Sequence, residues 1–484
     1  PGLREALGLS EDGDEARVRV DEVEATAHGL VAAMAATGWN PAEVESVAGE
    51  HGSTVVDILR FAATEVVPRL RGTSNEISQV LHALDGGFIA AGPSGSPLRG
   101  LINVLPTGRN FYSVDPKAVP SKLAWETGQA MAESLLARYR KDHGDWPKSV
   151  GLSVWGTSAM RTSGDDVAEV FALLGVSPVW DEASRRVTKL EVIDLDELGR
   201  PRIDVTVRIS GFFRDAFPHV LALLDDAVRL VAALDESAEQ NYVRAHAQAD
   251  LAEHGDERRA TTRIFGSKPG TYGAGLLQLI DSKTWRSDED LAQVYTTWGG
   301  FAYGRGLDGV PASDDMRTAY RRIAVAAKNT DTREHDIADS DDYFQYHGGM
   351  VATVRALTGK SRTLSEETAR VFRARVINPR WLDAMRRHGY KGAFEMAATV
   401  DYLFGYDATT DVVADWMYEK LAETYVLDEQ NQKFMQQSNP WALHGIAERL
   451  LEAAERKMWA EPDPKVLDGL RQVYLATEGD LEGE

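Results

Sequence analysis

Apolar residues follow a helical spacing through the N-terminal part of the chain. Between residues 21 and 70, Ala, Leu and Val recur three and four positions apart, and Gly-Trp-Asn-Pro interrupts them at 38–41. This spacing is typical of amphipathic helices. Residues 1–95 are therefore predicted to form a small helical region. The Gly-, Pro- and Ser-rich stretch at 90–100 is predicted to be a boundary or an exposed loop.

Strand patterns and helix patterns alternate after residue 95. Short apolar runs predict strands at 101–105, 149–155, 189–195 and 202–210, and longer periodic segments predict helices at 121–141, 165–175 and 214–234. In the last strand Ile203, Val205 and Val207 alternate with polar residues, which predicts one exposed face. We expect residues 96–240 to form an α/β domain with a doubly wound, largely parallel sheet.

Helical patterns are frequent from about residue 285 to the C-terminus. They include the segments 288–298, 314–328, 366–376, 411–426 and 440–459. Residues 241–484 are therefore predicted to form a mainly helical C-terminal domain. The expected fold class is α/β followed by a large, mostly α region.

Composition excludes several classes of function. The chain has 484 residues, a formal net charge of −22 and no cysteine. The charge disfavours binding to nucleic acid, and the lack of cysteine excludes disulfides, zinc-thiolate sites and a cysteine nucleophile. No apolar run approaches the ~20 residues that span a bilayer, and the first residues lack the order of a signal peptide. We expect a cytoplasmic protein without a membrane span.

Acidic residues and histidines gather in the stretch 334–350. Glu334, His335, Asp336, Asp341 and His347 lie within it, followed by Gly348 and Gly349. Carboxylate and imidazole together bind borderline divalent ions without thiolate, and both also accept protons. The spacing matches no recognised ligand motif, so a capped, solvated helix start with two ordinary histidines remains the alternative.

Two further segments are candidate ligand sites. Residues 155–166 leave the end of a predicted strand and enter a helix at Asp165 and Asp166, where ligands collect in open α/β sheets. The alternative is that both acids only stabilise the helix N-terminus. The glycine-rich loop 266–275 contains Lys268 and allows close approach to a ligand, or is a plain irregular connection. Gly-Lys-Ser at 359–361 lacks the first glycine of a phosphate loop, because Val354 occupies that place.

Several stretches together resemble the large subunits of class I metal chelatases, the family of CobN and its magnesium-chelatase counterpart. They are residues 105–128, 153–187, 198–228, 263–276, 334–350 and 439–443, in order. The cobalt branch is the nearer of the two, and the family's subunits are much longer, so the chain resembles their C-terminal part.

The resemblance implies a metal chelatase, a ligase that forms nitrogen–metal bonds. It implies ATP-dependent insertion of Co²⁺, as substrate, into hydrogenobyrinic acid a,c-diamide in aerobic cobalamin biosynthesis. The large subunit would bind the tetrapyrrole, and an AAA+ ATPase subunit and a von Willebrand-type subunit would use ATP and Mg²⁺. The alternatives are a magnesium chelatase acting on protoporphyrin IX and a noncatalytic tetrapyrrole-binding paralogue.

Within this resemblance we assign expected roles to individual residues. As the ion enters, the ring loses two pyrrolic protons and the ion sheds water, which requires proton acceptors and oxygen or nitrogen donors. The expected catalytic set is Glu334, His335, Asp336 and His347, with Asp165 as a further acid. The expected metal ligands are His335, Asp341 and His347. Arg109, Arg161 and Lys268 are expected to bind the peripheral carboxylates of the substrate.

Overall fold

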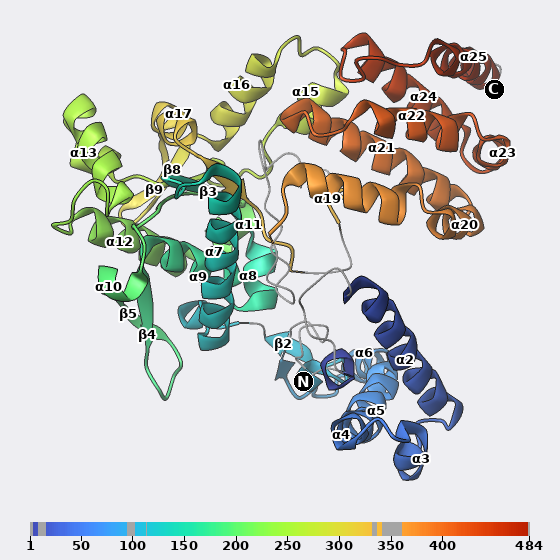
Figure 1. The fold of residues 1–484 in the computed structure, drawn as a ribbon, viewed down its shortest axis with the longest axis horizontal. Helices are drawn as coiled ribbons and strands as arrows, with labels where there is room; N and C mark the ends of the chain where they lie inside the picture. The colour runs from blue at the N-terminus through green and yellow to red at the C-terminus, as the bar shows by residue number, and fades with distance from the viewer. Residues whose placement is uncertain are drawn as a thin grey trace. The chain divides into compact units, whose positions relative to one another are not determined.

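A computed structural model describes residues 3–7, 16–93, 102–112, 114–331, 336–340 and 361–482. The chain divides into two compact units, Pro1–Val114 and Asp115–Glu484 (Figure 1). The unit boundary thus lies some way beyond the predicted end of the first region at residue 95. Among the described helices, none is both long enough and apolar enough to cross a membrane.

Helices make up most of the first unit. They are α1 (Leu3–Ala6), α2 (Ala16–Ala36), α3 (Val44–Ala48), α4 (Ser53–Phe61), α5 (Val67–Arg71) and α6 (Asn75–Leu84), and α2 is the longest of them. Their core includes Met34, Val44 and Leu59, all almost fully buried. Two short parallel strands, β1 (Gly92–Pro93) and β2 (Asn110–Tyr112), follow α6.

The strand predicted at 101–105 is wrong. Residues Ile102–Val104 form a 3-10 turn, in which the Leu105 amide donates to the Ile102 carbonyl. Pro106 follows directly, and a proline has no N–H with which to continue a strand ladder.

A six-stranded mixed sheet forms the centre of the second unit. Its strand order is β10-β3-β6-β7-β8-β9. The strands are β3 (Ser149–Val154), β6 (Asp204–Ile209), β7 (Ile264–Gly266), β8 (Phe301–Gly304), β9 (Leu307–Pro311) and β10 (Val325–Ala327). β10, β3, β6 and β7 pair in parallel, whereas β8 and β9 are antiparallel. The strands predicted at 149–155 and 202–210 are confirmed as the parallel strands β3 and β6, whereas the strand predicted at 189–195 is antiparallel and lies outside this sheet. The sheet also extends far beyond residue 240.

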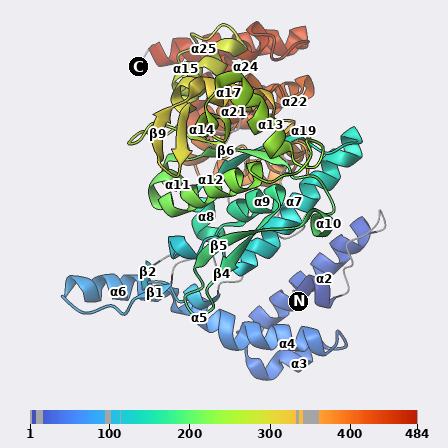
Figure 2. The same cartoon turned by 90° about the vertical axis from the view of Figure 1, so that its left-hand side faces the viewer.

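Helices connect and cover these strands. α7 (Lys122–His143) and α9 (Asp165–Leu174) lie side by side, and α9 contacts β3 and β6 (Figures 1 and 2). The remaining helices between 156 and 321 are α8 (Gly156–Thr162), α10 (Leu195–Leu198), α11 (Gly211–Ala216), α12 (Pro218–Ala232), α13 (Tyr242–His254), α14 (Glu257–Ala260), α15 (Leu276–Asp281), α16 (Asp288–Gly299) and α17 (Ser313–Arg321). β4 (Val176–Trp180) and β5 (Val187–Val192) form a separate antiparallel pair.

The described residues from 361 onward are helical apart from their connections. They form α19 (Leu364–Val371), α20 (Pro379–Arg387), α21 (Tyr390–Thr410), α22 (Asp415–Leu421), α23 (Glu429–Ser438), α24 (Pro440–Glu455) and α25 (Pro464–Glu482). Their apolar core includes Phe265 of β7 and Ala302 of β8, so the helices and the sheet share one core. Arg138 of α7 also donates to both carboxylate oxygens of Glu366 on α19, at 2.9 and 3.0 Å.

Three other sequence expectations are wrong in detail. β6 has no exposed face, since all six of its residues are buried, and its polar Asp204 forms a buried ion pair with Arg263. The helix expected at 214–234 is broken, and Pro218 starts α12. The end of the helix expected at 314–328 is instead β10, since Val325 pairs with Val150 of β3.

Candidate functional site

Four segments of the chain emerge at one edge of the sheet. They follow β3, β6, β7 and β10, and the carboxyl ends of parallel strands lie at the same edge. The chain passes from β3 to β6 on one side, whereas β10 pairs on the other side of β3. Such a reversal of strand order is where open α/β sheets bind ligands. We call residues 155–169, 210–215, 267–275 and 328–331 the strand-end site.

Short contacts hold these segments together. The Gly156 amide donates to Ser210 Oγ at 3.2 Å, which joins the ends of β3 and β6. A Cβ on Gly211 would lie only 2.5 Å from the Tyr272 ring, so the ends of β6 and β7 are also in contact. Asn329 reaches from the end of β10 to α9. The strand-end site is therefore continuous across all four parallel strands.

Buried acids of α9 form the polar centre of the strand-end site. Asp165, Asp166 and Glu169 are each at most 3% exposed. Asn329 Nδ2 donates to Asp166 Oδ1 at 2.7 Å and to Glu169 Oε2 at 2.6 Å, so one amide bridges two carboxyl groups. Glu169 Oε1 and Asn329 Oδ1 are buried and have no hydrogen-bond partner among the described residues. Buried polar atoms of this kind are rare and often mark functional sites.

The surroundings of Asp166 and Glu169 favour their protonated forms. The pKa of Asp166 is raised to about 7, mainly by burial and also by the nearby Asp331 and Asp165, while the hydrogen bond from Asn329 acts in the opposite direction. Burial likewise raises the pKa of Glu169 to about 8, with Asp166 and Asp165 acting in the same direction. Carboxyl groups with such pKa values exchange protons near neutral pH, which ordinary acids do not.

Arg161 pairs with the end of β10. Its Nε and NH2 donate to the two oxygens of Asp331 at 2.6 and 3.0 Å, which fixes the segment after β10 against α8. Lys328 in the same segment is buried, with its ammonium 5.6 Å from the centre of the Trp155 ring. The expected contact of Arg161 with a substrate carboxylate stays a prediction. In that contact the substrate carboxylate and Asp331 would bind the same guanidinium.

Asp336 lies at the start of the short described segment 336–340. Arg375 donates to its two oxygens at 2.8 and 2.9 Å, and also contacts Asp339 at 3.2 Å. This ion pair connects the segment after β10 to the C-terminal helices. Its contacts are those of an anchoring carboxylate, and the expected catalytic role of Asp336 stays a prediction.

The glycine-rich loop after β7 is held by one buried arginine. Arg214 NH1 donates to the carbonyl oxygens of Ser267, Lys268 and Thr271 at 3.2, 2.9 and 3.1 Å. The side chain of Lys268 is exposed. This loop is therefore a fixed part of the strand-end site. Lys268, which is expected to bind a carboxylate of the substrate, lies on its surface, and that role stays a prediction.

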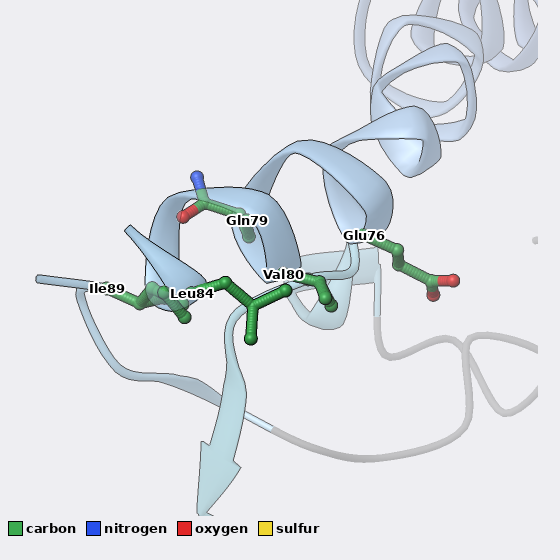
Figure 3. Close-up of a pocket in the computed structure, with 7 residues that line it drawn as sticks. Glu76, Gln79, Val80, Leu84 and Ile89 are labelled. Atoms are coloured by element: carbon green, nitrogen blue, oxygen red, sulfur yellow. The ribbon is translucent and has the colours of Figure 1, made fainter. Parts of the chain in front are cut away.

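Arg109 belongs to the first unit rather than to the second. Beside it, Gly108 lines a pocket of about 570 Å³ together with Glu76, Gln79, Val80, Ala83, Leu84 and Ile89. Figure 3 shows Val80 and Leu84 on one side of α6, with Ile89 beside Leu84. The role of Arg109 in substrate binding stays a prediction.

Four of the predicted residues, Glu334, His335, Asp341 and His347, lie outside the described residues. The predicted metal ligands are all among these four. Within the described ranges, no group of three or more His, Asp or Glu side chains is arranged to hold a metal ion.

Sequence reasoning missed the buried acid pair. It left Asp165 and Asp166 open between a ligand site and a helix start, included only Asp165 in the expected catalytic set, and overlooked Glu169 and Asn329. One signal was available: after its acidic first turn α9 contains only apolar residues apart from Glu169, which is typical of a buried helix, so that glutamate could be expected to be buried as well. No comparable signal marks Asn329, because its partners lie 160 and 163 positions away.

Comparisons with known proteins agree with one another. The family model described as CobN/Magnesium Chelatase matches residues 4–466. The aerobic cobaltochelatase subunit CobN of Pseudomonas aeruginosa is 47% identical over 431 residues, covering 84% of this chain and 34% of that protein. The H subunit of the magnesium chelatase of Chlorobaculum parvum is 32% identical over 504 residues, covering 99% of this chain and 40% of that protein.

A solved structure is also similar throughout. The catalytic subunit of cobaltochelatase from Mycobacterium tuberculosis has 72% sequence identity and a TM-score of 0.94, covering 99% of this chain and 42% of that chain. The present chain thus spans roughly a third to two fifths of the length of these relatives. On the extent of the family match and of these identities, the chain belongs to the CobN/magnesium chelatase family.

Proposed function

We propose that the chain is part of the large, tetrapyrrole-binding subunit of an ATP-dependent cobaltochelatase. The reaction is insertion of Co²⁺ into hydrogenobyrinic acid a,c-diamide. Identity of 47% to CobN, against 32% to a magnesium-chelatase relative, favours cobalt over magnesium. The observation that carries the proposal is the buried Asp166–Asn329–Glu169 cluster at the ligand-binding edge of the sheet in a member of this family.

Metal insertion requires proton acceptors next to the ring. Two N–H bonds break, the electron pairs stay on nitrogen to bind the ion, and two protons leave. Groups with pKa values near 7 and 8, such as Asp166 and Glu169, accept and release protons at neutral pH without a large energetic barrier. Asp165 lies beside them at the start of α9. We propose that this cluster accepts protons displaced from the ring.

The acid and histidine residues after Asp331 complete the proposed site. Glu334, His335, Asp336 and His347 are proposed to accept protons, and His335, Asp341 and His347 to bind the ion while it sheds water. Arg161 and Lys268 are proposed to pair with peripheral carboxylates of the ring. The charge of Lys268 is exposed, which suits this role.

Energy for the reaction is proposed to come from partner subunits. The sequence contains no complete phosphate-binding loop, since Val354 stands where that motif needs glycine. An AAA+ ATPase subunit would hydrolyse ATP with Mg²⁺, and a von Willebrand-type subunit would couple it to this one.

A selectivity assay tests the proposal. The complete subunit, with partner subunits and ATP, is supplied with Co²⁺ or Mg²⁺ and with hydrogenobyrinic acid a,c-diamide or protoporphyrin IX, and insertion is followed by absorbance. We expect product from Co²⁺ and the corrin precursor only. Product from Mg²⁺ and protoporphyrin would assign the subunit to magnesium chelation, and ring binding without insertion in any combination would make it a noncatalytic binder.

A further inference from the structure

Two aromatic rings are exposed within the strand-end site. Phe212, in α11 after β6, is 39% exposed, and Tyr272, in the loop after β7, is 61% exposed. Each ring lies against a glycine of a neighbouring segment. A Cβ on Gly156 would be 2.6 Å from the Phe212 ring, and a Cβ on Gly211 would be 2.5 Å from the Tyr272 ring. Glycine is therefore required at both places for the rings to lie so close to the backbone.

Polar contacts to the buried Arg214 and the exposed Asp215 fix the orientation of the Tyr272 ring. Its hydroxyl donates to Asp215 Oδ2 at 2.7 Å, and the Arg214 guanidinium lies 5.3 Å from the ring centre. Arg214 is itself only 6% exposed and binds Asp215 as well as three carbonyls of the loop. Tyr272 thus keeps an exposed face although its position is set by a network that is anchored on the buried Arg214, which is how a preorganised binding surface differs from a mobile side chain.

A positive charge lies in the same loop. Lys268 is exposed, and its ammonium group has no ion-pair partner among the described residues, while its carbonyl is held by Arg214 and Thr271. In a chain with a net charge of −22, an unpaired lysine beside exposed aromatic rings favours a ligand that is both flat and anionic.

We propose that Phe212 and Tyr272 form a stacking platform for one face of the tetrapyrrole, and that Lys268 binds a carboxylate at the ring's edge. This inference rests on the proposed function and deepens it, because it locates the macrocycle over the ends of β6 and β7. The platform lies on the same edge of the sheet as the acids of α9, so a ring placed there lies within the strand-end site. Arg214 and Asp215 are positioning residues that hold the platform.

Ring binding by the complete subunit tests this inference. Hydrogenobyrinic acid a,c-diamide is titrated while intrinsic fluorescence quenching is followed, with a melting curve for each variant. Loss of an aromatic stacking partner predicts that Tyr272→Ala and Phe212→Ala each weaken binding about five- to ten-fold. Tyr272→Phe, which keeps the ring, should bind nearly as the wild type does. Lys268→Ala should weaken binding by a similar factor at low salt and by less at high salt.

The matched control is Tyr390→Ala. Tyr390, at the start of α21, is 65% exposed and lies outside the strand-end site, so its removal should leave ring binding unchanged. Wild-type affinity in both Tyr272→Ala and Phe212→Ala would overturn the platform while leaving the proposed function intact. Equal losses in Tyr390→Ala would also overturn it. Absence of ring binding by the wild-type subunit would instead overturn the proposed function together with this inference.

Discussion

Glu169 lies in the middle of α9, where its neighbours Ala168 and Val170 are fully buried with it. Such a position normally excludes a charge, because removing a carboxylate from water is costly. The single described hydrogen bond, from Asn329, offsets only part of this cost. The result is a carboxyl group that is mostly protonated at neutral pH but also populates the ionised form that can accept a proton.

Stability should depend on pH through Glu169. Its pKa is about 8 in the folded chain and roughly 4.3 when unfolded, so the folded state holds an extra proton between these values. The resulting stabilisation is present below about pH 4 and is lost as the pH rises through 8. Melting temperatures of wild type and Glu169→Gln should thus be similar near pH 5, and the variant should melt several degrees higher above pH 8. A constant difference in melting temperature between wild type and Glu169→Gln from pH 5 to above pH 8 would contradict the prediction.

The residues after Asp331 give a separate prediction. Glu334→Ala, His335→Ala and His347→Ala in the complete subunit should each reduce cobalt insertion with little change in ring binding, because they are proposed to act on protons and on the ion. Loss of a helix cap would instead lower stability by about 0.5–2 kcal/mol and leave insertion per folded molecule unchanged. Insertion, ring binding and melting temperature are therefore measured for each variant. Unchanged insertion rates in all three variants would contradict the prediction and favour a solvated helix start at 334–350.

Site residues can be predicted from the sequence when the pattern that marks them is local, and not when their partners lie far away along the chain. Asp165 and Lys268 can be found from sequence because each lies in a segment with its own local pattern, a strand-to-helix turn or a glycine-rich loop. Glu169 is joined to Asp166 by Asn329, 160 positions away, and Arg214 binds the loop after β7, 53 to 57 positions away. A periodic pattern reports on neighbours within a few residues and carries no information on such partners.

Among the elements, α7 and α9 show how a helix is fixed in the site. Gly128 of α7 faces Ala168 of α9, and a Cβ on Gly128 would lie 2.5 Å from the Ala168 Cβ and 2.6 Å from its carbonyl carbon. The two helices are therefore closer than any larger residue allows. Because Ala168 precedes Glu169, this packing also sets the position of the buried acid pair.

Gly128→Ala should accordingly destabilise the second unit. The added methyl meets backbone, which cannot move aside as a side chain can, so we expect a loss of about 1–3 kcal/mol in the free energy of unfolding. Gly445→Ala in α24 is the matched control, since nothing lies within 4 Å of its added Cβ. It should stabilise by about 0.5–1 kcal/mol through helix propensity. Denaturant unfolding measures the free energy of unfolding of both variants. Equal changes in Gly128→Ala and Gly445→Ala would contradict the packing argument.

Element prediction succeeds where local pattern and tertiary position agree. α7 begins one residue after Ser121, whose Oγ accepts from the Ala124 amide, and α9 ends before Gly175 in a left-handed conformation; both follow from capping rules. The predictions for β6 and β10 are wrong for the opposite reason. The polar residues of β6 are buried with charged partners, and β10 is a strand only because β3 is available to pair with it.

The molecule as a whole divides the proposed reaction between this chain and its partners. Insertion is placed at the strand-end site, whereas no complete phosphate-binding loop exists in the sequence. We predict that the purified chain hydrolyses no ATP by itself. Phosphate release is measured with the chain alone, after removal of contaminating ATPases. Turnover that follows the chain through further purification would contradict this division.

The central claim is that ring protons are accepted at the strand-end site, and the rate of cobalt insertion tests it most directly. The complete subunit is assayed with its partners and ATP at saturating ring, as wild type and as Glu169→Gln. Asp407→Asn is the control, because Asp407 is also buried with a raised pKa, about 6, but binds Tyr418 among the C-terminal helices. Positioned proton acceptors typically contribute about 10²–10⁴-fold. We predict that Glu169→Gln lowers insertion per folded molecule at least about ten-fold, with ring affinity retained, and that Asp407→Asn does not; equal rates in wild type and Glu169→Gln would contradict the claim.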